Sequence, residues 1–167
     1  MKYSKNITII AALLVACWCA GILAAPVLLS AGDHSSAHAL YAFYGRVCHQ
    51  DDARSFHCAG EKFGVCIRCT AIYFSFLAAT LLLLFRMPKR YDERTLRRTI
   101  IVAALPMIID ALLDVSGLHA STTLTRIVSG AVFGGVMPWI LFPLFLEALR
   151  QLRRTQPFIH QNPENRV

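Results

Sequence analysis

The sequence predicts an all-α polytopic membrane protein: a bundle of four transmembrane helices with a cysteine- and histidine-rich loop outside the cytoplasm. Three observations lead to this prediction. Of the 167 residues, 56% are hydrophobic, and the mean hydropathy is positive. Four apolar runs each approach or exceed the roughly 20 residues that a helix needs to cross a bilayer. The basic residues gather next to the ends of these runs that would lie on one side of the membrane.

The predicted spans follow from continuous apolar runs, which favour helices over the alternating strands of a barrel. They are Ile7–Ser30, Cys66–Phe85, Thr99–Val115 and Leu124–Leu149. The first run contains a lipoprotein-like box at Leu14–Cys17, but it continues to Leu29. This exceeds the roughly 7–15 apolar residues of a secretory signal, so we expect an uncleaved helix.

The basic residues predict the orientation. Twelve of the 17 lysines and arginines would share one side: Lys2, Lys5, Arg86, Lys89, Arg90, Arg94, Arg97, Arg98, Arg150, Arg153, Arg154 and Arg166. The positive-inside rule places this side, with both termini, in the cytoplasm. Residues 31–65 then form an outer loop, and residues 151–167 a basic, flexible cytoplasmic tail. Such flanking segments contact anionic membrane lipid, and their distribution argues against nucleic-acid binding.

The stretch from Cys48 to Tyr73 holds four cysteines and two histidines. Outside the cytoplasm, thiols oxidise unless a metal holds them or a redox cycle reduces them. Cys66 and Cys69 form a C-x-x-C at the start of a helix, where unpaired N–H groups and Arg68 favour thiolate. Together Cys48, His49, Cys66 and Cys69 supply three sulfurs and one nitrogen, a set that suits zinc or copper.

Two carboxylates in the third span point to a second part of the same site. Asp110 and Asp114 are four residues apart and share a helical face. Charged residues in a membrane are costly and usually face the bundle interior or a wet cavity. With Arg126 and Arg68 they form the candidate catalytic set, which would handle a small-molecule or lipid-linked substrate. The alternative is a structural ion-pair network.

The fourth span carries a packing signal. Gly130 and Gly134 form a G-x-x-x-G pattern, which predicts close approach of a neighbouring helix.

The chain resembles a family of small prokaryotic membrane proteins of unknown function. The resemblance lies in Cys48-His49-Gln50, Arg54-Ser55-Phe56, Cys66-x-Arg68-Cys69-x-x-Ile72-Tyr73, Pro106 with Asp110, and Ser121–Arg126 with Gly130. The chain departs from the family pattern at Ala71, Ala111 and Thr123, where glycine, glycine and asparagine are usual. The resemblance implies the plasma (inner) membrane of a prokaryote and no established activity.

A more general architectural likeness is to quinone-coupled disulfide-forming membrane oxidoreductases. It implies a quinone cofactor, with Cys66 and Cys69 as the quinone-side pair and Cys48 and Cys58 as a shuttle pair. Three hypotheses therefore stay open: a metal site, thiol–disulfide exchange with a quinone, and a non-enzymatic subunit or lipid-headgroup binder with structural disulfides. The sequence does not decide between enzyme and non-enzyme, and it is compatible with an oligomer.

Overall fold

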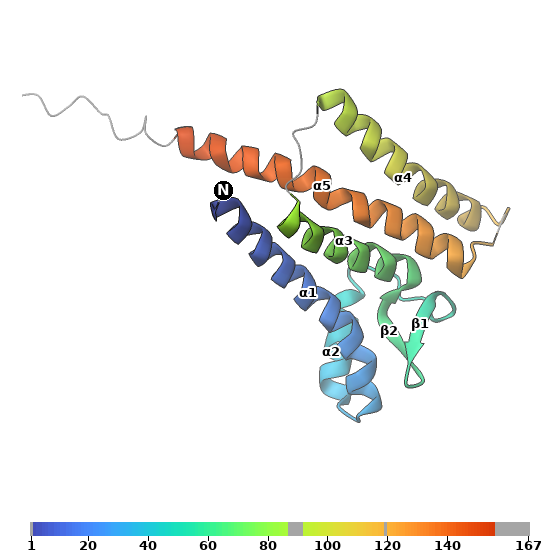
Figure 1. Cartoon of the computed structure of the whole chain (residues 1–167). Coiled ribbons are helices and arrows are strands. Elements are labelled where there is room, and N and C mark those ends of the chain that lie inside the picture. The colour runs from blue at the N-terminus through green and yellow to red at the C-terminus, as the bar shows by residue number, and fades with distance from the viewer. Residues whose placement is uncertain (1, 87–91, 119, 156–167) are drawn as a thin grey trace, which may run out of the picture.

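The computed structural model describes residues 2–86, 92–118 and 120–155, and it is mostly helical. Four long helices are α1 (Lys2–Ser30), α3 (Ile67–Phe85), α4 (Glu93–Val115) and α5 (Thr123–Thr155). They lie side by side in the order α1, α3, α5, α4 (Figure 1), because α1 packs on α3, α3 on α5 and α5 on α4. The predicted helical class is confirmed.

Three of these helices are long and apolar enough to cross a membrane: Lys5–Ser30 within α1, Ile67–Phe85, and Thr123–Leu149 within α5. Each agrees closely with a predicted span. The third predicted span, 99–115, is helical, but α4 is not among the three. Even its last 18 residues contain Arg98, Asp110 and Asp114. A four-span bundle is therefore not established by length and composition.

Two helices have ends that differ from the predicted ones. The helix α4 begins at Glu93, so Arg94, Arg97 and Arg98 belong to it and not to the preceding loop. The helix α5 continues to Thr155, into the predicted tail. The rest of that tail, 156–167, lies outside the described residues.

The glycines of α5 fix how this helix lies against α3. A Cβ atom added to Gly130 would come within 2.6 Å of the Arg68 carbonyl oxygen, and one added to Gly134 within 2.2 Å of the Ile72 carbonyl oxygen. Only glycine permits such an approach. Both pairs advance by four residues, so α3 and α5 run parallel and begin at the same end. The packing predicted from G-x-x-x-G is confirmed.

The predicted outer loop is folded. It contains α2 (His34–Tyr44), a 3₁₀ turn η1 (Asp52–Arg54) and an antiparallel hairpin of β1 (Ser55–Cys58) and β2 (Glu61–Cys66). Figure 1 places these elements together at one end of the molecule, where α3 begins. The hairpin turns through Ala59 and Gly60, both with positive φ, as a two-residue type I′ turn requires.

Side-chain hydrogen bonds hold this folded loop on α1 and on itself. The Tyr44 hydroxyl donates to the Trp18 carbonyl oxygen at 2.7 Å. The Gln50 amide nitrogen donates to the carbonyl oxygens of Tyr41 and Gly64, at 2.8 and 2.7 Å. Gln50 has φ 51°, a left-handed conformation that turns the chain from α2 toward the hairpin. These bonds fix the segment that carries Cys48.

Candidate functional site

Three cysteines converge where the folded loop meets α3. The Sγ atoms of Cys48, Cys66 and Cys69 all lie within 4.8 Å of one another. Cys48 is 7% exposed, and the other two are half-buried. All three are free thiols. We call them the three-thiol group.

Each thiol is positioned by a different local feature. Cys48 follows α2, and its sulfur accepts a hydrogen bond from the Cys66 backbone N–H at 3.2 Å. Cys66 ends β2, where it pairs with Ser55, and it occupies the N-cap position of α3. Cys69 lies in the first turn of α3. Unpaired N–H groups and the positive end of the helix dipole therefore lie beside the sulfurs, as the C-x-x-C spacing predicted.

The three-thiol group is set in an aromatic and aliphatic core. Cys48 is buried with Ile22, Tyr44 and Val65, and Trp18 and Tyr73 pack around the group. Hydrogen bonds from the thiols of Cys66 and Cys69 hold the pKa of Cys48 well below its usual range, although burial acts in the opposite direction. The lowered pKa favours a thiolate at Cys48, the form that binds metals or attacks disulfides.

Two residues of the predicted cysteine chemistry lie outside the three-thiol group. His49, the predicted nitrogen ligand, is exposed and is not a member of the group. Cys58, the predicted shuttle partner of Cys48, is an exposed free thiol at the turn end of the hairpin, where it pairs with Glu61. In the redox hypothesis Cys48 was paired with Cys58. In the structure Cys48 lies beside Cys66 and Cys69 instead.

The four candidate catalytic residues form a second group, with Ser121 at its centre. Arg68 forms an ion pair with Asp110. Arg126 Nη2 lies 3.3 Å from Asp114 Oδ2. The Ser121 hydroxyl lies 2.8 and 2.9 Å from the two carboxylate oxygens of Asp110. Its backbone N–H donates to Asp114 Oδ1 at 3.1 Å, and its oxygen accepts from Arg126 Nε at 3.2 Å.

Arg54 joins this network from the folded loop. Its Nη1 atom lies 2.9 Å from Asp114 Oδ2, and its Nε atom 3.1 Å from Asp51 Oδ2. We call Arg54, Arg68, Asp110, Asp114, Ser121 and Arg126 the ion-pair network. Arg54 is a basic residue that the sequence offers as a partner for these carboxylates, whereas Ser121 is identified only through the family resemblance, because a serine in a short connection gives no signal of its own.

Consecutive residues of α3 face the two groups. Cys69 packs with the residues around Trp18 and Tyr44, on the side of α1 and α2. Arg68 reaches Asp110 of α4 and lies 3.4 Å from Ser121 Oγ. The predicted site at one end of the molecule therefore consists of two groups, on different faces of α3.

Apolar helices of membrane-spanning length, joined by a cysteine-bearing folded loop, define a helical membrane protein. The chain belongs to the family described as "Predicted membrane protein (DUF2085)", whose model matches residues 48–140. The match begins at the first cysteine of the three-thiol group.

Two archaeal relatives are uncharacterised. The protein MJ1492 of Methanocaldococcus jannaschii is 31% identical over 112 residues, which cover 66% of this chain and 70% of the relative. A protein of Methanothermobacter thermautotrophicus is 30% identical over 88 residues, which cover 53% of this chain and 78% of the relative. No solved structure matches the chain.

Proposed function

We propose that the protein is a four-span membrane protein with a zinc or copper site, held by Cys48, Cys66 and Cys69, at its extracytoplasmic end. The observation that carries the proposal is the convergence of the three sulfurs within 4.8 Å. In a tetrahedral zinc site with Zn–S bonds of about 2.3 Å, sulfurs lie about 3.8 Å apart. Small side-chain rotations bring the three-thiol group to that spacing.

The parallel register of α3 and α5 supports the four-span arrangement. Two parallel helices that both cross a membrane need a return crossing between them, and α4 is the helix that connects them. Its 23 residues extend about 34 Å at 1.5 Å per residue, enough for the hydrocarbon core. Its carboxylates are paired with arginines, which lowers the cost of placing them in a bundle.

Three thiolates leave one coordination position of a tetrahedral ion for another ligand. Zinc sites with three protein ligands keep such an open position for water or substrate. His49 is adjacent in sequence, but its side chain is exposed and would have to turn inward. Copper(I) also favours soft sulfur ligands and accepts three of them. In this proposal the ion-pair network stabilises the same end of the bundle and is not part of the metal site.

Metal analysis of protein purified in mild detergent tests the proposal. We expect about one zinc or copper ion per chain, which Cys48→Ser and Cys66→Ser each abolish. Cys58→Ser is the matched control, because Cys58 is an exposed thiol outside the group, and it should keep the ion. A metal content that Cys66→Ser leaves unchanged would contradict the proposal.

The second candidate function is thiol–disulfide exchange with a membrane quinone, favoured by the C-x-x-C at the start of α3. A single disulfide among three thiols leaves the third free to attack it, which is the arrangement that exchange needs. Counting free thiols in the same preparation separates the two functions. Three protected thiols with bound metal support the first function, and a Cys66–Cys69 disulfide without metal supports the second.

A further inference from the structure

The helix α2 of the folded loop packs along α1 and runs back beside it (Figure 1). It begins just after the end of α1, where the Asp33 N–H donates to the Leu28 carbonyl oxygen at 3.0 Å. It ends at Tyr44, whose hydroxyl donates to the Trp18 carbonyl oxygen. The last turn of α2 therefore lies level with Trp18, and its first turn lies level with the end of α1.

Trp18 is near the middle of the α1 segment that is long and apolar enough to cross a membrane. That segment, Lys5–Ser30, has 26 residues and extends about 39 Å at 1.5 Å per residue, more than the roughly 30 Å of the hydrocarbon core. Even when the whole excess lies on the side of the folded loop, the core reaches roughly seven residues beyond Trp18. This range includes Ile22, which packs against Cys48.

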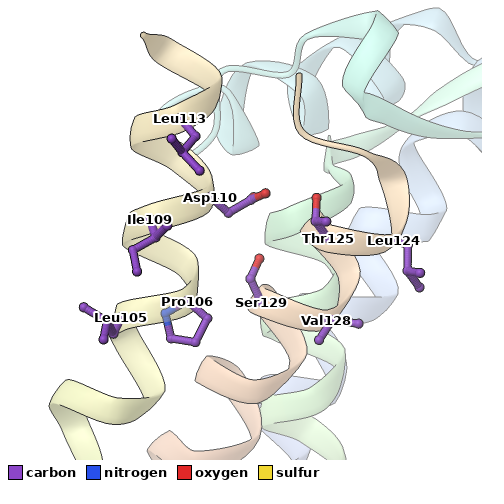
Figure 2. A pocket seen from close by; sticks show the side chains of 9 residues that line it. All are labelled: Leu105, Pro106, Ile109, Asp110, Leu113, Leu124, Thr125, Val128 and Ser129. Carbon is purple, nitrogen blue, oxygen red and sulfur yellow. The ribbon is translucent and has the colours of Figure 1, made fainter. Parts of the chain in front are cut away.

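The opposite edge of the row of helices supports this membrane level. Arg68 of α3 pairs with Asp110 of α4, and the apolar groove between α4 and α5 continues past Asp110 to Leu113. Figure 2 shows Ile109 on one side of Asp110 along α4 and Leu113 on the other side, nearer the end of the helix. Still further along, Val115 is 86% exposed. Apolar surface thus extends beyond the Arg68–Asp110 pair toward the folded loop.

The residues of α2 change from polar to apolar along the helix. Its first half contains His34 and His38, whereas no charged residue lies between His38 and Arg46. At the apolar end, Phe43 is 48% exposed, and Val47 in the turn that follows is 50% exposed. Because this end lies level with a membrane span, the exposed side chains of Phe43 and Val47 are placed where lipid chains surround α1.

The turn after α2 meets the requirement that lipid imposes on a polar backbone. Irregular backbone at membrane depth is tolerated where its polar groups are paired or buried in protein. The N–H groups of residues 45–48 all donate to carbonyl oxygens of α2, at 2.8–3.3 Å. The Gln50 amide donates to the carbonyl oxygens of Tyr41 and Gly64. The turn therefore carries few backbone groups that need water.

Arg46 limits how deep this turn can lie. Its side chain is exposed and forms no ion pair within the described part of the chain. A charge in hydrocarbon is costly, but an arginine keeps its stem among lipid chains while its guanidinium reaches the phosphate groups. His49 is exposed as well. These two polar side chains place the turn in the upper part of the leaflet, within reach of the head groups.

We propose that α2 is a re-entrant helix whose end and following turn, Phe43–Cys48, insert among the phospholipid chains of the leaflet next to the folded loop. Arg46 binds a lipid phosphate there, and the three-thiol group lies below the phosphate groups. The proposal rests on α1 crossing the membrane, and it is independent of metal at the three-thiol group.

Photo-crosslinking to lipid tests this inference. The full chain, with p-benzoylphenylalanine in place of Phe43 or of Val47, is irradiated in nanodiscs of phosphatidylcholine and phosphatidylglycerol, and lipid adducts are measured by intact-protein mass. Leu13, which is 65% exposed within the α1 span, is the membrane reference position. Cys58 at the turn end of the hairpin is the aqueous reference position. We expect both test positions to give at least half the adduct of Leu13 and at least tenfold more than Cys58.

The two test positions keep the experiment decisive. Phe43 also contacts Trp18, with 5.4 Å between ring centroids, so its replacement could disturb the fold, whereas Val47 is replaced at an exposed position. Adduct yields at both positions as low as at Cys58 would overturn the proposal. Metal content is measured on the same samples before irradiation. Absence of metal with lipid adducts retained would contradict the metal site alone, and metal without adducts would contradict the re-entrant helix alone.

A charge reversal tests the contact between Arg46 and phosphate. With p-benzoylphenylalanine at position 47, Arg46→Glu should lower the lipid adduct at least threefold, because a carboxylate is repelled by phosphate. Arg46→Lys is the matched control and should retain the adduct, since lysine also reaches the head groups from a position in lipid. Equal adduct yields in Arg46→Glu and Arg46→Lys would overturn the assignment of Arg46 as the phosphate-binding residue.

Discussion

Arg54 of the folded loop and Asp114 of α4 are joined side chain to side chain, with 2.9 Å between Nη1 and Oδ2. They are 60 residues apart in the chain. Arg54 also holds Asp51, so one guanidinium connects the 3₁₀ turn to the end of a long helix. The folded loop is therefore attached to α4 as well as to α1.

This attachment predicts that substitutions of Arg54 and Asp114 lower the stability of the protein by different amounts. Asp114→Asn should lower the thermal unfolding temperature more than Arg54→Ala, because Asp114 also pairs with Arg126 and accepts from the Ser121 N–H. The double variant should lose less stability than the sum of the two single variants, since each of them already removes the shared Arg54–Asp114 contact. Thermal unfolding in detergent measures this. Fully additive effects of the two substitutions would contradict direct coupling.

The contact between α3 and α5 predicts a sharp difference between neighbouring glycines. Gly134→Ala places a methyl group against the Ile72 carbonyl and should destabilise the protein by about 1–3 kcal/mol, the usual range for overpacking. Gly135→Ala is the control, because its added Cβ would be 4.0 Å from the nearest atom, Ser75 Cβ. It should be neutral or slightly stabilising. Equal destabilisation by both substitutions would contradict the packing described.

The hydrogen bonds of Gln50 predict that this residue supports the proposed metal site by fixing the segment that carries Cys48. Gln50→Glu replaces a donor with a carboxylate that faces the carbonyl oxygens of Tyr41 and Gly64. Leaving polar groups unpaired costs about 1–3 kcal/mol, and we expect the segment carrying Cys48 to loosen and the zinc dissociation constant to rise at least tenfold. His49→Ala should change it less than threefold, because His49 is exposed and outside the group. Competition with a chelator measures both, and a larger effect of His49→Ala would make the imidazole the fourth ligand.

The hydrogen bonds within the three-thiol group predict the protons that metal binding releases. Cys48 accepts from two thiols, which keep its pKa well below its usual range, so we expect Cys48 to bind zinc without releasing a proton at neutral pH. Zinc binding should then release fewer than three protons, and the affinity should fall on acidification. Calorimetry in buffers of different ionisation enthalpy counts these protons. Release of three protons would mean that Cys48 is an ordinary, protonated thiol before the metal binds.

The proposed orientation predicts which thiols can be labelled from outside the cell. Cys58 is exposed at the end of the hairpin, so an impermeant maleimide should label it in intact cells. A cysteine introduced by Arg94→Cys, at the other end of α4, should react only after permeabilisation. The same reactivity of both sites in intact cells would contradict the four-span arrangement.

The sequence was most informative where one physical effect dominates. Burial in lipid demands long apolar runs, and three predicted spans match helices of membrane-spanning length. The fold of 31–65 was not predicted, although Asp33 before α2 and Ala59-Gly60 in the hairpin are recognisable local signals. The many cysteines and histidines of this segment predicted ligand chemistry. The pairing of β1 with β2, which lies in the same segment, was not predicted.

The sequence predicted most residues of the candidate site, but it did not predict that they form two separate groups. Spacing placed Cys66, Arg68 and Cys69 at one helix end, but it does not state which neighbour each residue meets. Successive helical residues are rotated by about 100°, so Arg68 meets Asp110 and Cys69 meets Cys48. Adjacency of Cys48 and His49 suggested joint ligation, whereas the turn at Gln50 buries the first and exposes the second.

The position of α3 between the two groups has a consequence for how this family can diversify. Apart from Arg54 of the folded loop, the ion-pair network draws its remaining members from α4, α5 and the connection between them, which supply no thiol, so substitutions there need not disturb the thiols. A descendant could exchange its thiols for other side chains while the salt-linked helix ends stay intact, or lose the carboxylates while retaining the thiols. A single helix thus carries two groups of side chains that can diverge separately at the same end of one small protein.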